Sequence, residues 1–464
     1  MSGVHTTRSV GRTSPVTVSW WCEHAWLPSG PAAGVRVEAD VRGRITAVTP
    51  DTRPADGDVR LDGLVLPGFA NAHSHAFHRA LRGRTNLDGG TFWTWRDRMY
   101  TLADRLDPDS YRELATAVYG EMALAGITCV GEFHYLHHGP GGARYGDPNA
   151  MGEALRDAAH AAGIRLTLLD TCYLTGGIDV PLEGVQRRFD DGDAEGWADR
   201  VSMMKDDERF RVAAAVHSVR AVPADQLDIV VEAAQDDDGP RPLHVHLSEQ
   251  PAENEACLQV YGCTPTALLA EHGVLGSATT AVHATHLTDT DITMLGDSTT
   301  TVCVCPTTER DLADGIGPAR ALRDAGSPLA LGSDQHVVVD MLAESRGLEM
   351  HERLRSGHRG RFTVGELVEA LAPAGHAALG WNDAGRIEVG ALCDLVALRL
   401  DSLRTAGALP SQAPLVAAGG DVHAVVASGR TVVADGRHVR LEPDGERSIA
   451  RLLAAAVNRA WGDH

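Results

Sequence analysis

Eight short apolar segments in the middle of the chain, most of them closing with histidine, carboxylate or arginine, constrain the fold more than any other feature. They end at residues 73–75 or occupy 128–135, 165–173, 211–220, 242–249, 279–287, 300–306 and 328–336. Stretches with helical periodicity separate them, for example 110–126, 149–163, 224–235 and 341–354. Eight strand–helix repeats over roughly 315 residues predict an α/β fold, a TIM-like (β/α)8 barrel, which typically takes about 250 residues before insertions. A doubly wound open sheet is the alternative, but no GxGxxG motif opens the first helix.

Both ends of the chain have a different sequence pattern, in which Gly and Pro separate short β segments. This pattern predicts one small β-sandwich domain formed by both chain ends, residues 15–66 together with 385–440. The barrel would then occupy 67–384. Residues 1–14 are polar and are expected to be loose, and the amphipathic pattern within 441–464 predicts a C-terminal helix.

The charge balance excludes several classes of partner. Among 464 residues, 42 Lys and Arg face 63 Asp and Glu, a formal net charge of −21. Nucleic acids and anionic membranes both require positive charge, so neither is an expected partner. No apolar signal core precedes the first segment, and no run reaches the roughly 18 apolar residues of a membrane span. The eight cysteines contain no CxxC pair, which predicts free thiols and a cytoplasmic protein.

Polar residues at the strand ends would meet at one mouth of the barrel, because the carboxyl ends of all eight strands share a face. His73 and His75 end the first segment, and residues i and i+2 of an extended chain point the same way. An isolated HxH is weak among 22 histidines, so matching residues at other strand ends are needed. The four candidate metal ligands are His73, His75, His246 and Asp334. Glu249 and His283 lie close by in the pattern without being needed on the metal, which predicts proton carriers beside an activated water.

The lysine content bears on the number of metal ions. Lys205 is the only lysine, and it precedes the segment 211–220 rather than ending it. Binuclear barrel hydrolases commonly bridge their metals with a carbamylated lysine, which that segment does not offer. The sequence therefore predicts one divalent metal ion per subunit. Histidine and carboxylate ligands favour Zn²⁺, with Fe²⁺ and Mn²⁺ left open.

The motifs LPGFANAHSH, HVHLSEQ and LGSDQH, together with the isolated His283, resemble the amidohydrolase superfamily in its mononuclear deaminase branch. GRITAV and GRIEVGALCDLVAL resemble the β-sandwich of that superfamily, and the resemblance covers about residues 17–440. A narrower set, HSHAFHRALRG, TFWTWRDRMY, GEFHYLHH, HSVRAVP and HVHLSEQPAE, is similar to the formimidoylglutamate deiminase family. That family hydrolyses N-formimino-L-glutamate to N-formyl-L-glutamate and ammonia in histidine degradation.

The resemblance implies a role for each candidate residue. The metal ligands would be His73, His75, His246 and Asp334, and the catalytic residues would be Glu249, His283 and Asp334. The substrate contacts would be His78, Arg96, Tyr135, His217 and Arg220. His78 stands where the family usually has Gln, and a neutral ring offers one donor against the two of an amide. Arginine binds carboxylates bidentately, so Arg96 and Arg220 suit a small dicarboxylate amidine. The resemblance also implies a homodimer.

Two other functions stay open on the sequence. Another deaminase of the superfamily, acting on guanine, a related purine or another amidine, would show the same ligands. Paired arginines favour a dicarboxylate, whereas Phe92, Trp93 and Trp95, expected in a loop around Arg96, would suit a purine. A non-catalytic, metal-stabilised scaffold would lose chemical groups, and no metal or proton-transfer candidate is missing. The zinc deaminases of nucleic acids are excluded because no PCxxC motif occurs.

Overall fold

The computed structural model describes residues 18–85, 92–236, 239–442 and 448–462. Its central feature is a parallel sheet of eight strands in the order β14-β13-β12-β11-β8-β7-β6-β5. The strands are β5 (Phe69–Ser74), β6 (Ile127–His134), β7 (Arg165–Cys172), β8 (Phe210–Val216), β11 (Leu243–Leu247), β12 (Thr279–His283), β13 (Thr301–Val304) and β14 (Leu329–Leu331). A parallel bridge between Ser74 and Asp334 joins the two edge strands, so the sheet is nearly closed into a barrel. The predicted (β/α)8 fold is confirmed.

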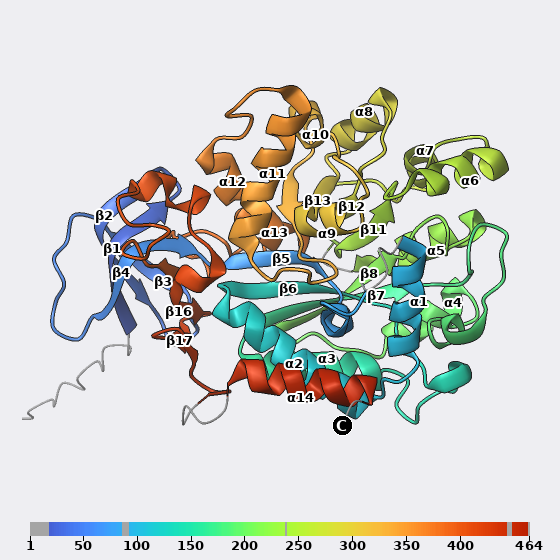
Figure 1. Cartoon of the computed structure of the whole chain (residues 1–464), viewed down its shortest axis with the longest axis horizontal. Helices are drawn as coiled ribbons and strands as arrows, with labels where there is room; N and C mark the ends of the chain where they lie inside the picture. Colours follow the sequence, from blue (N-terminus) through green and yellow to red (C-terminus); the bar gives the residue numbers. More distant parts are fainter. Residues whose placement is uncertain (1–17, 86–91, 237–238, 443–447, 463–464) are drawn as a thin grey trace, which may run out of the picture.

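Helices lie around the barrel (Figure 1). The α-helices are α1 (Phe92–Ala103), α2 (Pro108–Leu124), α3 (Ala150–Ala162), α4 (Ala194–Val201), α5 (Ala224–Ala233), α6 (Pro251–Tyr261), α7 (Pro265–Glu271), α8 (Asp289–Asp297), α9 (Pro306–Asp311), α10 (Ala319–Ala325), α11 (Met341–Ser356), α12 (Val364–Leu371), α13 (Pro373–Ala378) and α14 (Ile449–Trp461). Short 3-10 turns are η1 (Ala76–Leu81), η2 (Pro140–Gly142), η3 (Gly184–Arg188), η4 (Pro410–Leu415) and η5 (Gly419–Asp421). Local chemistry fixes several ends: Asp107 forms a capping box at the start of α2, and Gly163 ends α3 in the left-handed conformation.

Both ends of the chain contribute to a second eight-stranded sheet, at the left in Figure 1. Its strands are β1 (Val18–Leu27), β2 (Gly30–Ala39), β3 (Ile45–Thr49), β4 (Val59–Pro67), β15 (Leu395–Leu398), β16 (Val422–Ala427), β17 (Arg430–Ala434) and β18 (Arg437–His438). β4 joins the two halves, because it pairs with β1 on one side and with β15 on the other. A separate small hairpin consists of β9 (Gln235–Asp236) and β10 (Gly239–Pro240). The predicted loose residues 1–14 lie outside the described residues.

A buried ion pair ties the barrel to the second sheet. Arg165, the first residue of β7, donates its Nη1 and Nη2 to the two carboxylate oxygens of Asp394, the residue before β15. Both side chains are 1% exposed. Asp394 also accepts the backbone N–H of Ser428 at 2.7 Å. The pair therefore satisfies its charges inside the protein, which is the condition under which a buried ion pair is tolerated.

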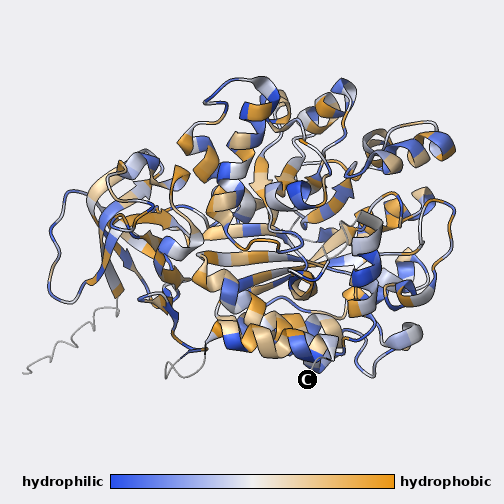
Figure 2. Ribbon diagram, in the orientation of Figure 1, coloured by the Kyte–Doolittle hydropathy of each residue, from blue (hydrophilic) through white to orange (hydrophobic). Residues whose placement is uncertain are grey.

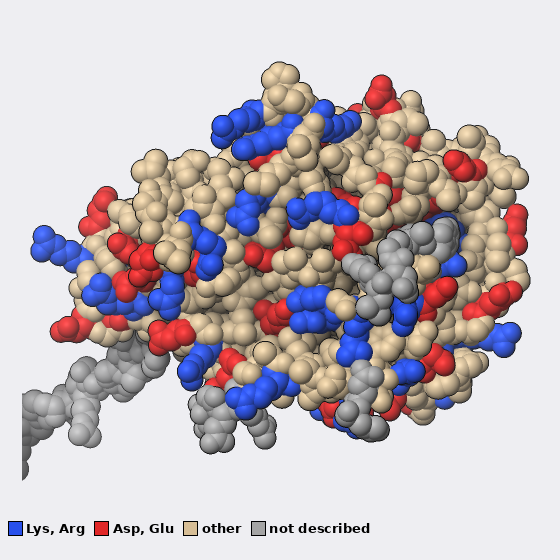
Figure 3. Space-filling view, viewed as in Figure 1, with Lys and Arg blue, Asp and Glu red and all other residues tan. Residues whose placement is uncertain are grey.

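The hydrophobic core follows the strands, which are mostly apolar in the centre of Figure 2. The C-terminal helix α14 lies along α2, with Ile449 against Gly120 and an ion pair between Arg459 and Glu113. On the face shown in Figure 3, basic and acidic side chains are interspersed. Within the described ranges, no helix has the length and apolar character needed to cross a bilayer. All eight cysteines carry free thiols, as predicted.

Candidate active site

Four predicted ligands from three regions of the barrel meet at its carboxyl-terminal mouth. His73 lies on β5, His75 follows it, His246 lies on β11 and Asp334 follows β14. The Nε2 atoms of His73 and His246 are 3.1 Å apart, and those of His73 and His75 each lie 3.4 Å from Asp334 Oδ1. One ligand atom from each of the four lies within 4.8 Å of the others. This spacing suits a shared cation, since Zn–N bonds measure about 2.0–2.1 Å.

The chemistry of these four groups also fits a divalent metal. The Nδ1 atoms of His75 and His246 each lie 2.9 Å from a backbone carbonyl, that of Phe133 or His217, which places the ring proton on Nδ1. Their Nε2 atoms then carry lone pairs directed toward the centre of the group. Burial lowers the pKa of His73, His75 and His246, so the imidazoles are neutral, the form that binds metal. A cation between these Nε2 atoms would resolve the close approach of His73 and His246.

His283 reaches this group through an unusual backbone. In the parallel ladder His246 pairs with Val282, and the side chains of paired residues lie on the same face of the sheet. Successive residues of a strand point to opposite faces, so His283 in an extended backbone would point away from His246. Instead His283 and Ala284 have φ of 69° and 52°, and the His283 ring stacks on that of His246 at 5.6 Å. Ser248 and Asp334 also have positive φ, 48° and 43°. Such conformations are costly for residues other than glycine and gather at functional sites.

Three carboxylates surround the His283 ring. Glu249 Oε1 and Asp334 Oδ2 each lie 3.8 Å from its Nε2, and Glu309 Oε1 lies 3.6 Å from its Nδ1. Burial alone would lower the pKa of His283, but these carboxylates raise it well above its ordinary value. Burial raises the pKa of Asp334, but the nearby positive charge of His283 acts against burial, and the net pKa lies below its ordinary value. His283 is therefore an imidazolium and Asp334 a carboxylate near neutral pH.

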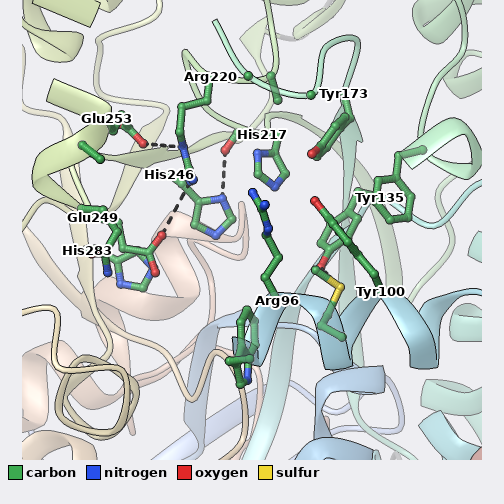
Figure 4. Close-up of a pocket in the computed structure, with 18 of the residues that line it drawn as sticks. Arg96, Tyr100, Tyr135, Tyr173, His217, Arg220, His246, Glu249, Glu253 and His283 are labelled. Carbon is green, nitrogen blue, oxygen red and sulfur yellow. Dashed lines mark hydrogen bonds and ion pairs between the residues drawn. The ribbon is translucent and has the colours of Figure 1, made fainter. Parts of the chain in front are cut away.

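A cavity of about 310 Å³ opens over these groups. All five residues predicted to contact substrate line it: His78, Arg96, Tyr135, His217 and Arg220. Figure 4 shows that Arg96 and Arg220 approach the cavity from different elements, Arg96 from α1 and Arg220 from the turn after β8. His78 Nε2 lies 3.0 Å from the Tyr135 hydroxyl. Its ring packs 4.5 Å from that of His75, so His78 lies directly beside a proposed ligand.

The prediction of a loop around Arg96 was wrong. Residues 92–103 form helix α1, and the Arg96 guanidinium lies over the ring of Tyr100, one helical turn away, at 5.5 Å. A dense run of aromatic residues hid the helical period from the sequence. Trp95 lines the cavity and its ring contacts that of His78 edge-on. The side chains of Phe92 and Trp93 lie outside the described residues.

The sequence reasoning missed several groups of the site. Glu253 on α6 pairs with Arg220, and Glu309 on α9 faces His283. Gln186 donates to the hydroxyls of Tyr100 and Tyr173, which line the cavity opposite Arg220 (Figure 4). Glu253 could have been found, because it lies one helical turn after Glu249 in the same polar segment. No local pattern marks the others, which come from elements far apart in the sequence, including α1, η3 and α9.

In a second cluster of possible metal ligands, His134, His137 and Asp170, the carboxylate is already held by protein contacts. Asp170 accepts Arg200 Nη1 at 3.0 Å and Nη2 at 2.7 Å, and the indole N–H of Trp197 at 3.0 Å. A guanidinium therefore already neutralises the carboxylate, and a further cation would be repelled. This cluster is best explained as a structural network.

Known proteins share this architecture and much of this sequence. The family model described as "Amidohydrolase family" matches residues 64–432. The chain is 36% identical to a formimidoylglutamate deiminase of Pseudomonas aeruginosa over 455 residues, 94% of this chain and 98% of that one. It is 32% identical to an 8-oxoguanine deaminase of the same organism over 400 residues, 85% of this chain and 87% of that one. The crystal structure of an amidohydrolase from Brucella melitensis superposes with a TM-score of 0.85 at 29% identity, covering 96% of this chain and 100% of that one.

Proposed function

The chain belongs to the amidohydrolase family, and on that premise we propose that it hydrolyses N-formimino-L-glutamate to N-formyl-L-glutamate and ammonia. One observation carries the choice of substrate: Arg96 and Arg220 line the same cavity as the metal-binding group. Two guanidinium groups match the two carboxylates of this substrate. The similarity to a formimidoylglutamate deiminase over nearly the whole chain supports the same assignment.

The reaction adds water to the formimino carbon and breaks its bond to the terminal nitrogen, which leaves as ammonia. A divalent ion held by His73, His75, His246 and Asp334, proposed as one Zn²⁺ per subunit, would supply a water of lowered pKa. Asp334, ionised beside that position, would accept the proton that the water loses. Glu249 would deliver a proton to the terminal nitrogen, so that the leaving group is neutral ammonia.

His283 would act as a fixed positive charge rather than as a base. Its Nε2 lies 3.8 Å from both Glu249 and Asp334, and the surrounding carboxylates keep the ring protonated. A charged donor beside the attacking oxygen stabilises negative charge as it develops. His217, Tyr135 and His78 would position the rest of the substrate, because they line the same cavity as the two arginines.

The test is ammonia release by metal-loaded protein with N-formimino-L-glutamate, N-formimino-L-aspartate, guanine and formamidine at equal concentrations. We expect N-formimino-L-glutamate to give the highest kcat/KM. A purine deaminase is the second candidate, favoured by the aromatic cavity walls Trp95, Tyr100, Tyr135 and Tyr173 and by the similarity to an 8-oxoguanine deaminase. Turnover of guanine without turnover of the formimino compounds would establish the purine deaminase and refute the proposed hydrolysis of N-formimino-L-glutamate.

A further inference from the structure

Arg220 has acidic partners on two sides (Figure 4). Its Nε lies 2.8 Å from Glu253 Oε2, and its Nη2 lies 3.7 Å from Glu249 Oε2. Glu253 is completely buried, whereas the Arg220 side chain is 24% exposed and faces the cavity. The substrate clamp is thus in contact with the proposed proton carrier.

Glu253 fixes this arrangement from behind. Its Oε1 accepts the backbone N–H of Ser248 at 2.8 Å, and Ser248 precedes Glu249 in the chain. One buried carboxylate therefore holds both the Arg220 guanidinium and the backbone that carries Glu249. The Arg220 Nε and Glu253 Oε2 atoms are close but not aligned as a hydrogen bond. Because this contact is not a hydrogen bond, the planar guanidinium can shift as a unit from Glu249 toward another anion in the cavity.

We propose that Arg220 is a substrate-operated gate: it pairs with Glu249 while the cavity lacks a carboxylate and releases Glu249 when a substrate carboxylate takes its place. A carboxylate paired with guanidinium is a poorer proton acceptor and carrier than a free one. A substrate carboxylate bound to Arg220 competes directly for the Nη2 that faces Glu249. The gate rests on the proposed function, and it makes the dicarboxylate part of the substrate act on catalysis as well as on binding.

The gate gives a result that a simple clamp does not. Formamidine carries the reacting group without any carboxylate, so the wild-type enzyme should process it with Arg220 still paired to Glu249. Glutarate supplies the missing carboxylates as a separate molecule. We expect glutarate to activate formamidine hydrolysis by the wild-type enzyme, with saturation, by about threefold or more. A clamp alone predicts only inhibition by glutarate.

Variants complete the test. Arg220→Met should raise formamidine kcat/KM above that of the wild type, abolish activation by glutarate and raise KM for N-formimino-L-glutamate. Arg220→Met leaves the buried Glu253 carboxylate without its cationic partner, which can destabilise the fold. The double variant R220M/E253Q removes that unpaired charge and repeats the measurement. Metal content and circular dichroism are recorded for each protein.

Each outcome bears on the gate. Inhibition of the wild-type enzyme by glutarate, formamidine turnover in both variants at or below the wild-type value, or no ammonia from formamidine with any protein would each overturn it. Activation by glutarate without turnover of N-formimino-L-glutamate would keep the gate and refute the proposed substrate. The two proposals therefore fail separately.

Discussion

Replacing Glu249 by Gln removes the proposed proton carrier and leaves the rest of the cavity in place. Gln has nearly the same shape, and Glu249 does not belong to the metal-binding group, so metal content should stay stoichiometric. Two cationic groups each lose one of their acidic partners, His283 at 3.8 Å and Arg220 at 3.7 Å, and keep the others. The variant thus separates loss of proton transfer from loss of metal.

The size of the effect follows from these contacts. A positioned proton carrier contributes roughly 10²–10⁴ to the rate, which is about 3–5 kcal/mol of transition-state stabilisation. A unit charge pair at this separation interacts by about 4 kcal/mol at an effective dielectric constant of about 20, so weaker support of the His283 charge adds a cost of similar order. We expect kcat for N-formimino-L-glutamate to fall by roughly 10³ or more.

The assay is steady-state ammonia release, with metal measured on the same samples. Glu255→Gln is the matched control, because Glu255 lies on helix α6, which begins two residues after Glu249, and is exposed. The control should keep wild-type kcat. A Glu249→Gln enzyme with full metal content and kcat within tenfold of the control would refute the role of Glu249 as proton carrier.

The other predictions concern stability and metal dependence. Asp394→Asn leaves Arg165 buried without a counter-charge, so urea denaturation should show that the free energy of unfolding falls by about 3–5 kcal/mol. The double variant R165M/D394L should restore most of that loss. An unchanged urea midpoint for Asp394→Asn would contradict this prediction. Burial raises the pKa of Asp170, but Arg200 lowers it to a net value of about 2, below the unfolded value of about 3.9. Its contribution of about 2–3 kcal/mol is therefore complete above pH 4 and disappears as the pH falls toward 2, and Asp170→Asn should flatten the acid limb of a stability-against-pH curve. Removing metal with a chelator should abolish activity and weaken the glutarate binding measured by calorimetry. Added Zn²⁺ should restore both. Tight glutarate binding to the metal-free protein would show that the metal does not contribute to anion binding.

The residues at the ends of the barrel strands were the part of the site that the sequence predicted best. The alternation of apolar strands with helical stretches predicts the barrel, and the rule that parallel strands share a carboxyl-terminal face brings His73, His246 and Asp334 together. The spacing of His73 and His75 follows from the two-residue period of a strand. These inferences depend only on local pattern and fold geometry, and the structure brings the side chains into contact.

Contacts made by helices and loops could not be predicted from the sequence in the same way. Arg96 was placed in a loop although it lies on α1, because the position of a helix next to the barrel mouth has no counterpart in the strand pattern. Glu309 faces His283 from α9, which follows a different strand, and its importance depends on a distance that sequence does not contain. The backbone turn at His283 is also not predictable from the sequence, because only a few per cent of residues other than glycine adopt positive φ and the enrichment of histidine there does not mark one position among 22 histidines.

The charges around the cavity reconcile a net charge of −21 with the anionic substrate proposed above. Four carboxylates, from Glu249, Glu253, Glu309 and Asp334, lie in or beside the cavity, against the cations Arg96, Arg220 and His283. Burial raises the pKa of the neighbouring Asp314 to about 8, so it adds little charge near pH 7. Burial also raises the pKa of Glu253, so the protein charges around the cavity come close to balancing, and a divalent ion at the proposed site would make the cavity net positive. N-formimino-L-glutamate, with two carboxylates and a formamidinium, carries one negative charge, so a net positive cavity would attract it. Neutral guanine would gain nothing from this charge, which supports the proposed dicarboxylate amidine over the purine.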